Sequence, residues 1–84
     1  MSVADEIRRH VIQEYIAPAR VKRQLTVAVR AGTVHKDMGF KNRLPSVCSA
    51  LGSDRFLQAA RVERLSIEGP SSGSNAVFTF RVLR

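Results

Sequence analysis

The first third of the chain shows helical spacing of apolar positions followed by strict alternation. Pro18 disfavours helical geometry at the residue before it, so we expect the first helix to end near Ala17. Residues 24–31 then alternate, with Leu25, Val27 and Val29 on one side, which predicts a half-buried strand. The amphipathic helix before Pro18 is predicted from one apolar face, made of Val3, Ile7, Val11, Ile12, Tyr15 and Ile16.

Residues 33–51 have the pattern of two short helices separated by a tight turn. In the first helix, Val34 and Met38 lie four residues apart and share one face. We expect Thr33 to cap this helix after a break at Ala31-Gly32. Gly39 suits the left-handed conformation that ends a helix.

The second helix of this pair carries one apolar stripe, and a helix-turn-helix can present such a helix to the DNA major groove. We expect Asn42 to cap it and Pro45 to fit its first turn. Gly52-Ser53 interrupts the pattern, and the sequence leaves open whether residues 53–60 form a further helix or continue this one. The stripe consists of Leu44, Val47, Cys48 and Leu51.

The C-terminal part alternates with a period of two in residues 62–68 and 76–83. A Gly- and Ser-rich loop separates the two runs, so they predict a β-hairpin. Phe78, Phe80 and Val82 are expected to form the inner face of the last strand. The fold class is therefore α+β.

This element order resembles the winged helix-turn-helix family of DNA-binding domains. The resemblance is carried by residues 34–40 (VHKDMGF), by Asn42-Arg43 and by the hairpin with its loop at residues 69–75. The chain departs from the family pattern at His35 and at Pro45. The resemblance implies one winged-helix domain over residues 1–84, with three or four helices, a small antiparallel sheet and a C-terminal hairpin as the wing.

The charge distribution favours a polyanionic partner. The chain has 84 residues, of which 14 are basic and 7 acidic, for a net charge of +7. The net charge is −1 over residues 1–19, +6 over residues 20–43 and +2 over residues 44–84. The excess thus lies on and just before the predicted helix-turn-helix, where a solvated face would carry mixed signs.

On this interpretation the chain binds double-stranded DNA, as a transcription regulator or as the DNA-contacting subunit of a larger system. Arg43 can pair with both acceptors of guanine, while Ser46 and Ser49 are short donors or acceptors on the exposed side, with Ala50 at its edge. Phosphate contacts are expected from Lys36, Lys41, His35 and the Asn42 turn, and also from Arg20, Lys22 and Arg23 unless these only solubilise the connector. The wing would contribute Ser71, Ser72, Ser74 and Asn75.

Other chemistry has little support in the sequence. The single Cys48 lies on an apolar stripe and is expected to be a buried thiol in a reducing cytoplasm, close to the nucleoid if the chain binds DNA. One Cys and two distant His residues give no metal-ligand spacing, and no cofactor motif or catalytic triad is present. No apolar run reaches the roughly 20 residues of a membrane span. We therefore expect no enzymatic activity, no metal, no cofactor and no membrane.

The sequence leaves open two alternative functions and the possibility of a homodimer. A basic winged helix can also serve as an adaptor for an acidic protein partner, and a small basic protein also fits RNA or the ribosome. Loss of Arg43 and Lys41 would distinguish DNA binding from the adaptor function. A homodimer could form through Tyr15 and Ile16 on the first helix, or through the last strand.

Overall fold

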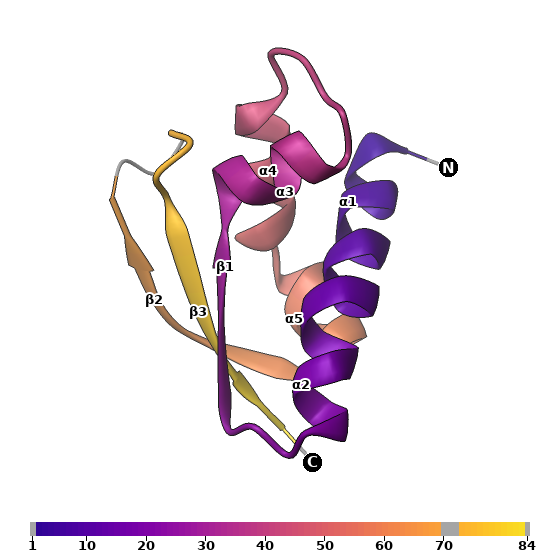
Figure 1. Cartoon of the computed structure of the whole chain (residues 1–84), viewed down its shortest axis with the longest axis vertical. Helices are drawn as coiled ribbons and strands as arrows, with labels where there is room; N and C mark the ends of the chain where they lie inside the picture. The colour runs from indigo at the N-terminus through magenta and orange to yellow at the C-terminus, as the bar shows by residue number, and fades with distance from the viewer. Residues whose placement is uncertain (1, 70–72, 84) are drawn as a thin grey trace.

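The computed structural model describes residues 2–69 and 73–83, and its helices cover one face of a three-stranded antiparallel sheet (Figure 1). The α+β class is thus confirmed. The elements are α1 (Val3–Val11), a π-helical segment (Ile12–Ile16), α2 (Ala17–Val21), β1 (Thr26–Arg30), α3 (Ala31–Asp37), α4 (Leu44–Leu51), α5 (Asp54–Ala60), β2 (Val62–Glu68) and β3 (Val77–Val82).

The first helix does not end at Ala17, so that prediction was wrong. The helical path runs on through α2 to Val21, as one column in Figure 1. A wide π turn precedes Pro18, in which the Ala17 N–H donates to the Ile12 carbonyl, five residues back. Proline is tolerated in the first turn of a helical segment, where its missing N–H is not needed. The π turn in effect restarts the helix just before Pro18.

The sheet has the order β1-β3-β2, and β2 and β3 form the predicted hairpin. Val29 pairs with Phe78 and Val27 with Phe80, so the apolar sides of β1 and β3 share one face. The strands are shorter than predicted, at Thr26–Arg30 and Val77–Val82. A register shift between Arg64 and Ser66 places a bulge in β2.

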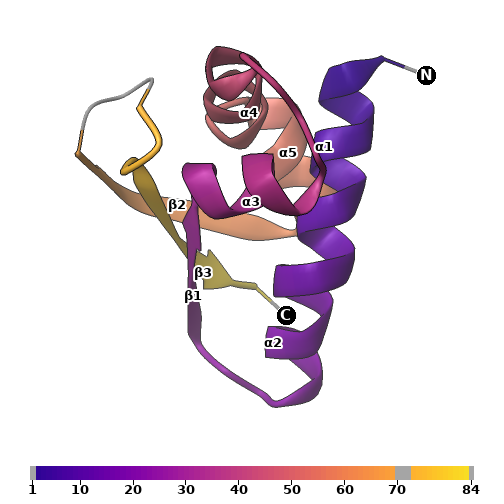
Figure 2. The same cartoon turned by 45° about the horizontal axis from the view of Figure 1, so that its top comes forward.

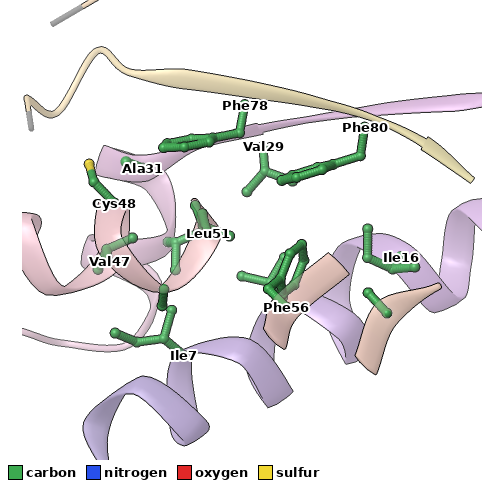
Figure 3. Packing of buried hydrophobic residues seen from close by; sticks show 14 of the residues in the cluster. Ile7, Ile16, Val29, Ala31, Val47, Cys48, Leu51, Phe56, Phe78 and Phe80 are labelled. Carbon is green, nitrogen blue, oxygen red and sulfur yellow. The ribbon is translucent and has the colours of Figure 1, made fainter. Parts of the chain in front are cut away.

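The core lies between this inner sheet face and the helices (Figure 3). Phe78 and Phe80 point from β3 toward the helices, and Phe56 of α5 meets Phe80 with 5.1 Å between ring centroids. Val82, predicted on the same inner face, is only half-buried because it lies at the strand end. Cys48 is buried as predicted.

Helix α3 begins at Ala31, directly after β1. The expected end of the strand at Ala31-Gly32 is therefore confirmed, whereas the predicted cap at Thr33 was wrong. The returning end of the hairpin supplies acceptors for the first N–H groups of α3 instead. The Ala31 N–H donates to the Ala76 carbonyl at 2.9 Å, and the Gly32 N–H donates to the Ser74 carbonyl at 3.0 Å. A long-range contact thus replaces the local cap.

Residues 54–60 form a separate helix, which resolves the alternative that the sequence left open. Ser53 is the N-cap of α5, and its Oγ accepts from the Phe56 N–H at 3.2 Å. Gly52 ends α4. The two helices therefore meet at a corner rather than forming one long helix.

Candidate nucleic-acid interface

The turn between α3 and α4 spans residues 38–43 and reverses the chain through two left-handed residues. Gly39 has φ +70°, which confirms the prediction, and Asn42 has φ +57°. The Gly39 N–H donates to the Lys36 carbonyl and the Phe40 N–H donates to the His35 carbonyl, which together end α3 in the paired pattern known as a Schellman motif. The helix pair is therefore formed, with a turn of six residues.

His35 stabilises this turn from within. Its Nε2 accepts a hydrogen bond from the Arg43 backbone N–H at 3.1 Å, and its ring packs edge-on against Phe40 with 6.0 Å between centroids. The sequence placed His35 toward phosphate, whereas the structure gives its Nε2 an intramolecular partner. The only sequence signal for this structural role of His35 is Phe40, an aromatic residue three positions after the end of α3.

The N-terminus of α4 has no side-chain cap. Arg43, not Asn42, occupies the N-cap position, so the predicted cap was wrong; Asn42 instead takes the left-handed conformation. Pro45 lies in the first turn as expected. An uncapped helix N-terminus offers backbone N–H groups and the positive end of the helix dipole to an anion.

Helix α4 exposes only a narrow strip. Pro45 and Ser49 are exposed and Ser46 is half-buried, whereas Ala50, expected at the exposed edge, is buried. Ala50 faces inward because the helix packs against both α1 and α3, which widens its buried face. The segment Leu44–Leu51 contains no charged side chain, so the strip itself offers only two hydroxyl groups.

The turn is basic. Lys36, Lys41 and Arg43 are exposed, and within the described residues no carboxylate lies at ion-pair distance from any of them. The one nearby acidic residue in sequence, Asp37, contacts the π-helical segment, where its Oδ2 accepts from the Tyr15 hydroxyl at 3.4 Å. Burial and this carboxylate raise the pKa of Tyr15.

Residues 73–75, the described return of the hairpin loop, lie at the same end of the molecule as the α3–α4 turn (Figure 2). Two hydrogen bonds hold the segment that leads from this loop into β3. The Arg30 guanidinium donates to Asn75 Oδ1 at 2.6 Å, and the Gly32 N–H donates to the Ser74 carbonyl. Arg30 was missed because nothing in the sequence links it to a loop 45 residues later. Ser74 and Asn75 are exposed; Ser71 and Ser72 lie outside the described residues.

Arg20, Lys22 and Arg23 do not join this site. Arg20 lies in the last turn of α2, and Lys22 and Arg23 lie at the start of the α2–β1 connection, at the opposite end of β1 from the α3–α4 turn (Figure 1). The Arg20 guanidinium donates to the backbone carbonyls of Ala60, at 2.8 Å, and Leu83. The prediction that the three residues lie beside the main site was therefore wrong, because β1 carries the chain from one end to the other.

Only part of the dimer surface predicted on the first helix is exposed. Ile16 is 1% exposed and packs in the core, so it is not available to a second copy, while Tyr15 is half-buried. In the part of the chain that the structure describes, no three His, Cys, Asp or Glu side chains gather as metal ligands. None of the helices described has the length and apolar character needed to cross a bilayer.

Comparison of the chain with protein-family models, curated proteins and solved structures gave no significant match.

Proposed function

We propose that this chain is a small double-stranded DNA-binding domain of the winged helix-turn-helix type. One observation carries the proposal. Lys36 at the end of α3 and Lys41 and Arg43 in the α3–α4 turn are exposed and unpaired among the described residues, and the turn shares one end of the molecule with residues 73–75 of the hairpin loop (Figure 2). A helix pair and an adjacent hairpin at one basic end can contact a duplex together.

The topology supports this choice of fold type. The order of helix, strand, helices and hairpin follows the resemblance noted in the sequence, and β1 pairs with β3 beside the hairpin partner β2. Helix α5, between α4 and β2, is the short further helix that this order left open. The domain would act as a transcription regulator or as the DNA-contacting part of a larger assembly.

Phosphates are the main targets in the proposed complex. The uncapped N-terminus of α4 and the side chains of Lys36, Lys41 and Arg43 all favour anions. Arg43, exposed at the N-cap, would reach a base edge, and Ser46 and Ser49 would follow along the exposed strip. Because α4 itself offers no long polar side chain, we expect affinity to depend on phosphate contacts and to vary little with base sequence.

Salt dependence of duplex binding tests this proposal. Three phosphate contacts predict that the logarithm of affinity falls with the logarithm of salt concentration with a slope of about −3. The double variant Lys41→Ala/Arg43→Ala should weaken binding and reduce the slope by about 2. Fluorescence anisotropy with a labelled random-sequence duplex measures both quantities.

The matched control is Lys22→Ala/Arg23→Ala, which removes the same charge from the opposite end. It should leave the slope of the unsubstituted protein nearly unchanged. Equal losses in the two double variants would show that only net charge matters and would refute the assignment of the site. Absence of binding at about 50 mM salt, where non-specific electrostatic affinity is strong, would refute DNA binding itself.

Duplex DNA is favoured over RNA by the placement of the aromatic rings. Sequence-specific binding of single-stranded RNA usually relies on exposed aromatic side chains that stack on bases. Phe56, Phe78 and Phe80 are in the core, and Phe40 packs on His35. Tighter binding of a single-stranded RNA of the same length, measured in the same titration, would reverse this preference.

A further inference from the structure

The end opposite the α3–α4 turn exposes aliphatic side chains that the core does not use. This end, which we call the α2–β1 end, comprises residues 17–25, 60–62 and 82–83. Val21 is 82% exposed, Leu25 72% and Leu83 40%. Leu25 and Leu83 also line a groove of about 320 Å³, together with Arg20, Arg23, Gln24 and Val82. Concave apolar surface of this kind suits insertion of a side chain from a partner.

The same end is uniformly basic. Its three segments contain Arg20, Lys22, Arg23 and Arg61 and no acidic residue. Lys22, Arg23 and Arg61 are exposed, and none of them has a carboxylate at ion-pair distance within the described residues. The adjacent Arg81 and Glu63 offset each other, with 3.9 Å between Nη1 and Oε2.

Two of these arginines occupy backbone positions that favour glycine. Arg23 has φ +58° and Arg61 has φ +56°. Arg23 follows the last turn of α2, where the Gln24 N–H donates to the Ala19 carbonyl, and Arg61 ends α5. Glycine is the usual residue at such helix ends, and strained backbone concentrates at functional sites. A long cation at both positions is costly for folding alone, which indicates a use at the surface.

We propose that the α2–β1 end docks an acidic segment of a partner protein that also carries aliphatic side chains. One aliphatic side chain of the segment would enter the groove beside Leu25, and its carboxylates would pair with Lys22, Arg23 and Arg61. This function is separate from DNA binding and uses none of the residues of the α3–α4 turn.

Charge and shape favour this occupant over three others. A second copy in a symmetric dimer would bring two basic ends together, which is unfavourable. A nucleic acid would leave Val21 and Leu25 without apolar partners. A bilayer is a flat surface and would not fill the groove.

A synthetic peptide of alternating Glu and Leu residues is a suitable probe, with a Lys-and-Leu peptide of the same length as the charge control. Amide shifts in ¹⁵N spectra of the whole chain should change only near residues 20–25, 61 and 82–83 on addition of the acidic peptide. Val21→Ser/Leu25→Ser should weaken binding about tenfold, a loss typical of contact residues. Leu65→Ser/Ile67→Ser, which alters two exposed aliphatic residues of β2, is the matched control and should bind normally.

Arg23→Gly separates binding from folding. The substitution relieves the left-handed backbone at φ +58°, so its thermal midpoint should equal or exceed that of the unsubstituted protein. Its peptide affinity should nevertheless fall, by about threefold for one lost charge pair. A variant that folds better and binds worse cannot be explained by damage to the fold.

Several results would overturn the proposal. These are no amide shifts at about 1 mM peptide, where even weak binding is measurable, equal binding of the Lys-and-Leu peptide, or shifts centred on residues 36–43. Binding to phosphatidylserine vesicles that is lost in Val21→Ser/Leu25→Ser, without peptide binding, would assign this end to membranes instead. Duplex DNA binding that depends on Lys22 and Arg23 would assign it to nucleic acid. The peptide and vesicle results do not bear on the Lys41→Ala/Arg43→Ala comparison, so the two proposals can fail separately. Dependence of duplex binding on Lys22 and Arg23 would contradict both.

Discussion

His35 connects the two helices of the candidate interface through a single hydrogen bond. Substitution to Ala removes the acceptor for the Arg43 N–H and the ring contact with Phe40. We expect His35→Ala to lower the free energy of unfolding by about 1 kcal/mol, because the bond is exposed to competing water. Urea denaturation measures this loss, and Lys36→Ala, an exposed neighbour on the same helix, should change stability by less than about 0.5 kcal/mol. Equal effects in the two variants would show that the bond contributes nothing.

Cys48 gives the molecule a pH dependence at the alkaline end. Burial raises the pKa of the Cys48 thiol above its ordinary value of 9.0, so the folded state favours the protonated thiol. The resulting stability is complete below pH 9 and is lost as the pH rises through the higher folded-state pKa. The thermal midpoint should therefore fall above pH 9, and less steeply in Cys48→Ala. Tyr15, whose pKa is also raised, should account for the decrease in thermal midpoint that remains in Cys48→Ala. An identical dependence of the thermal midpoint on pH in the unsubstituted protein and in Cys48→Ala would contradict the role of Cys48.

At the scale of elements, the start of α3 depends on the hairpin. A Cβ at Gly32 would lie 2.6 Å from the Ser74 carbonyl oxygen, closer than side-chain carbons ever approach backbone. Gly32→Ala should therefore separate the hairpin return from α3 and cost about 2 kcal/mol in unfolding experiments. Thr33→Ala is the informative control, since Thr33 does not cap α3 and its loss should cost well under 1 kcal/mol. A larger loss for Thr33→Ala would restore the capping role that the sequence suggested.

Arg20 joins three elements through its guanidinium. It donates to the carbonyls of Ala60 and Arg61, at the end of α5, and of Leu83, just after β3. We expect Arg20→Ala to destabilise the fold by about 2 kcal/mol, and Arg20→Lys to recover little, because an ammonium cannot span acceptors as a planar fork does. Thermal unfolding compares these variants with Lys22→Ala, an exposed neighbour that should be neutral. Full recovery in Arg20→Lys would show that charge alone is required.

The elements that could be predicted from sequence are those specified by local patterns. Alternation located β1 and the hairpin, and Gly39 marked the end of α3 because the left-handed conformation favours glycine. The errors involve partners far away in sequence. The start of α3 depends on acceptors from residues 74–76, and the helix passes Pro18 by means of a π turn that no local rule predicts.

At the scale of the whole molecule, the basic run of residues 20–43 is divided between two ends. In sequence it is one cluster, but β1 separates its halves by about 15 Å, the length of a five-residue strand. The candidate site could therefore be predicted only in part. Lys36 in α3 and Lys41 and Arg43 in the α3–α4 turn are exposed, whereas Arg20, Lys22 and Arg23 belong to the α2–β1 end.

This separation predicts that the two proposed partners bind independently. The two charge clusters are about 15 Å apart along β1, roughly twice the Debye length of about 8 Å at physiological salt, so charges bound at one end are largely screened from the other. Duplex affinity measured with saturating Glu-and-Leu peptide should therefore change less than about twofold, and peptide affinity should change equally little when duplex is present.

Lowering the salt to about 10 mM extends the Debye length to about 30 Å. Two negatively charged partners attached to the same positive molecule should then oppose one another measurably. Complete competition at physiological salt would mean that both partners occupy the same surface, and that the charge run acts as one site after all.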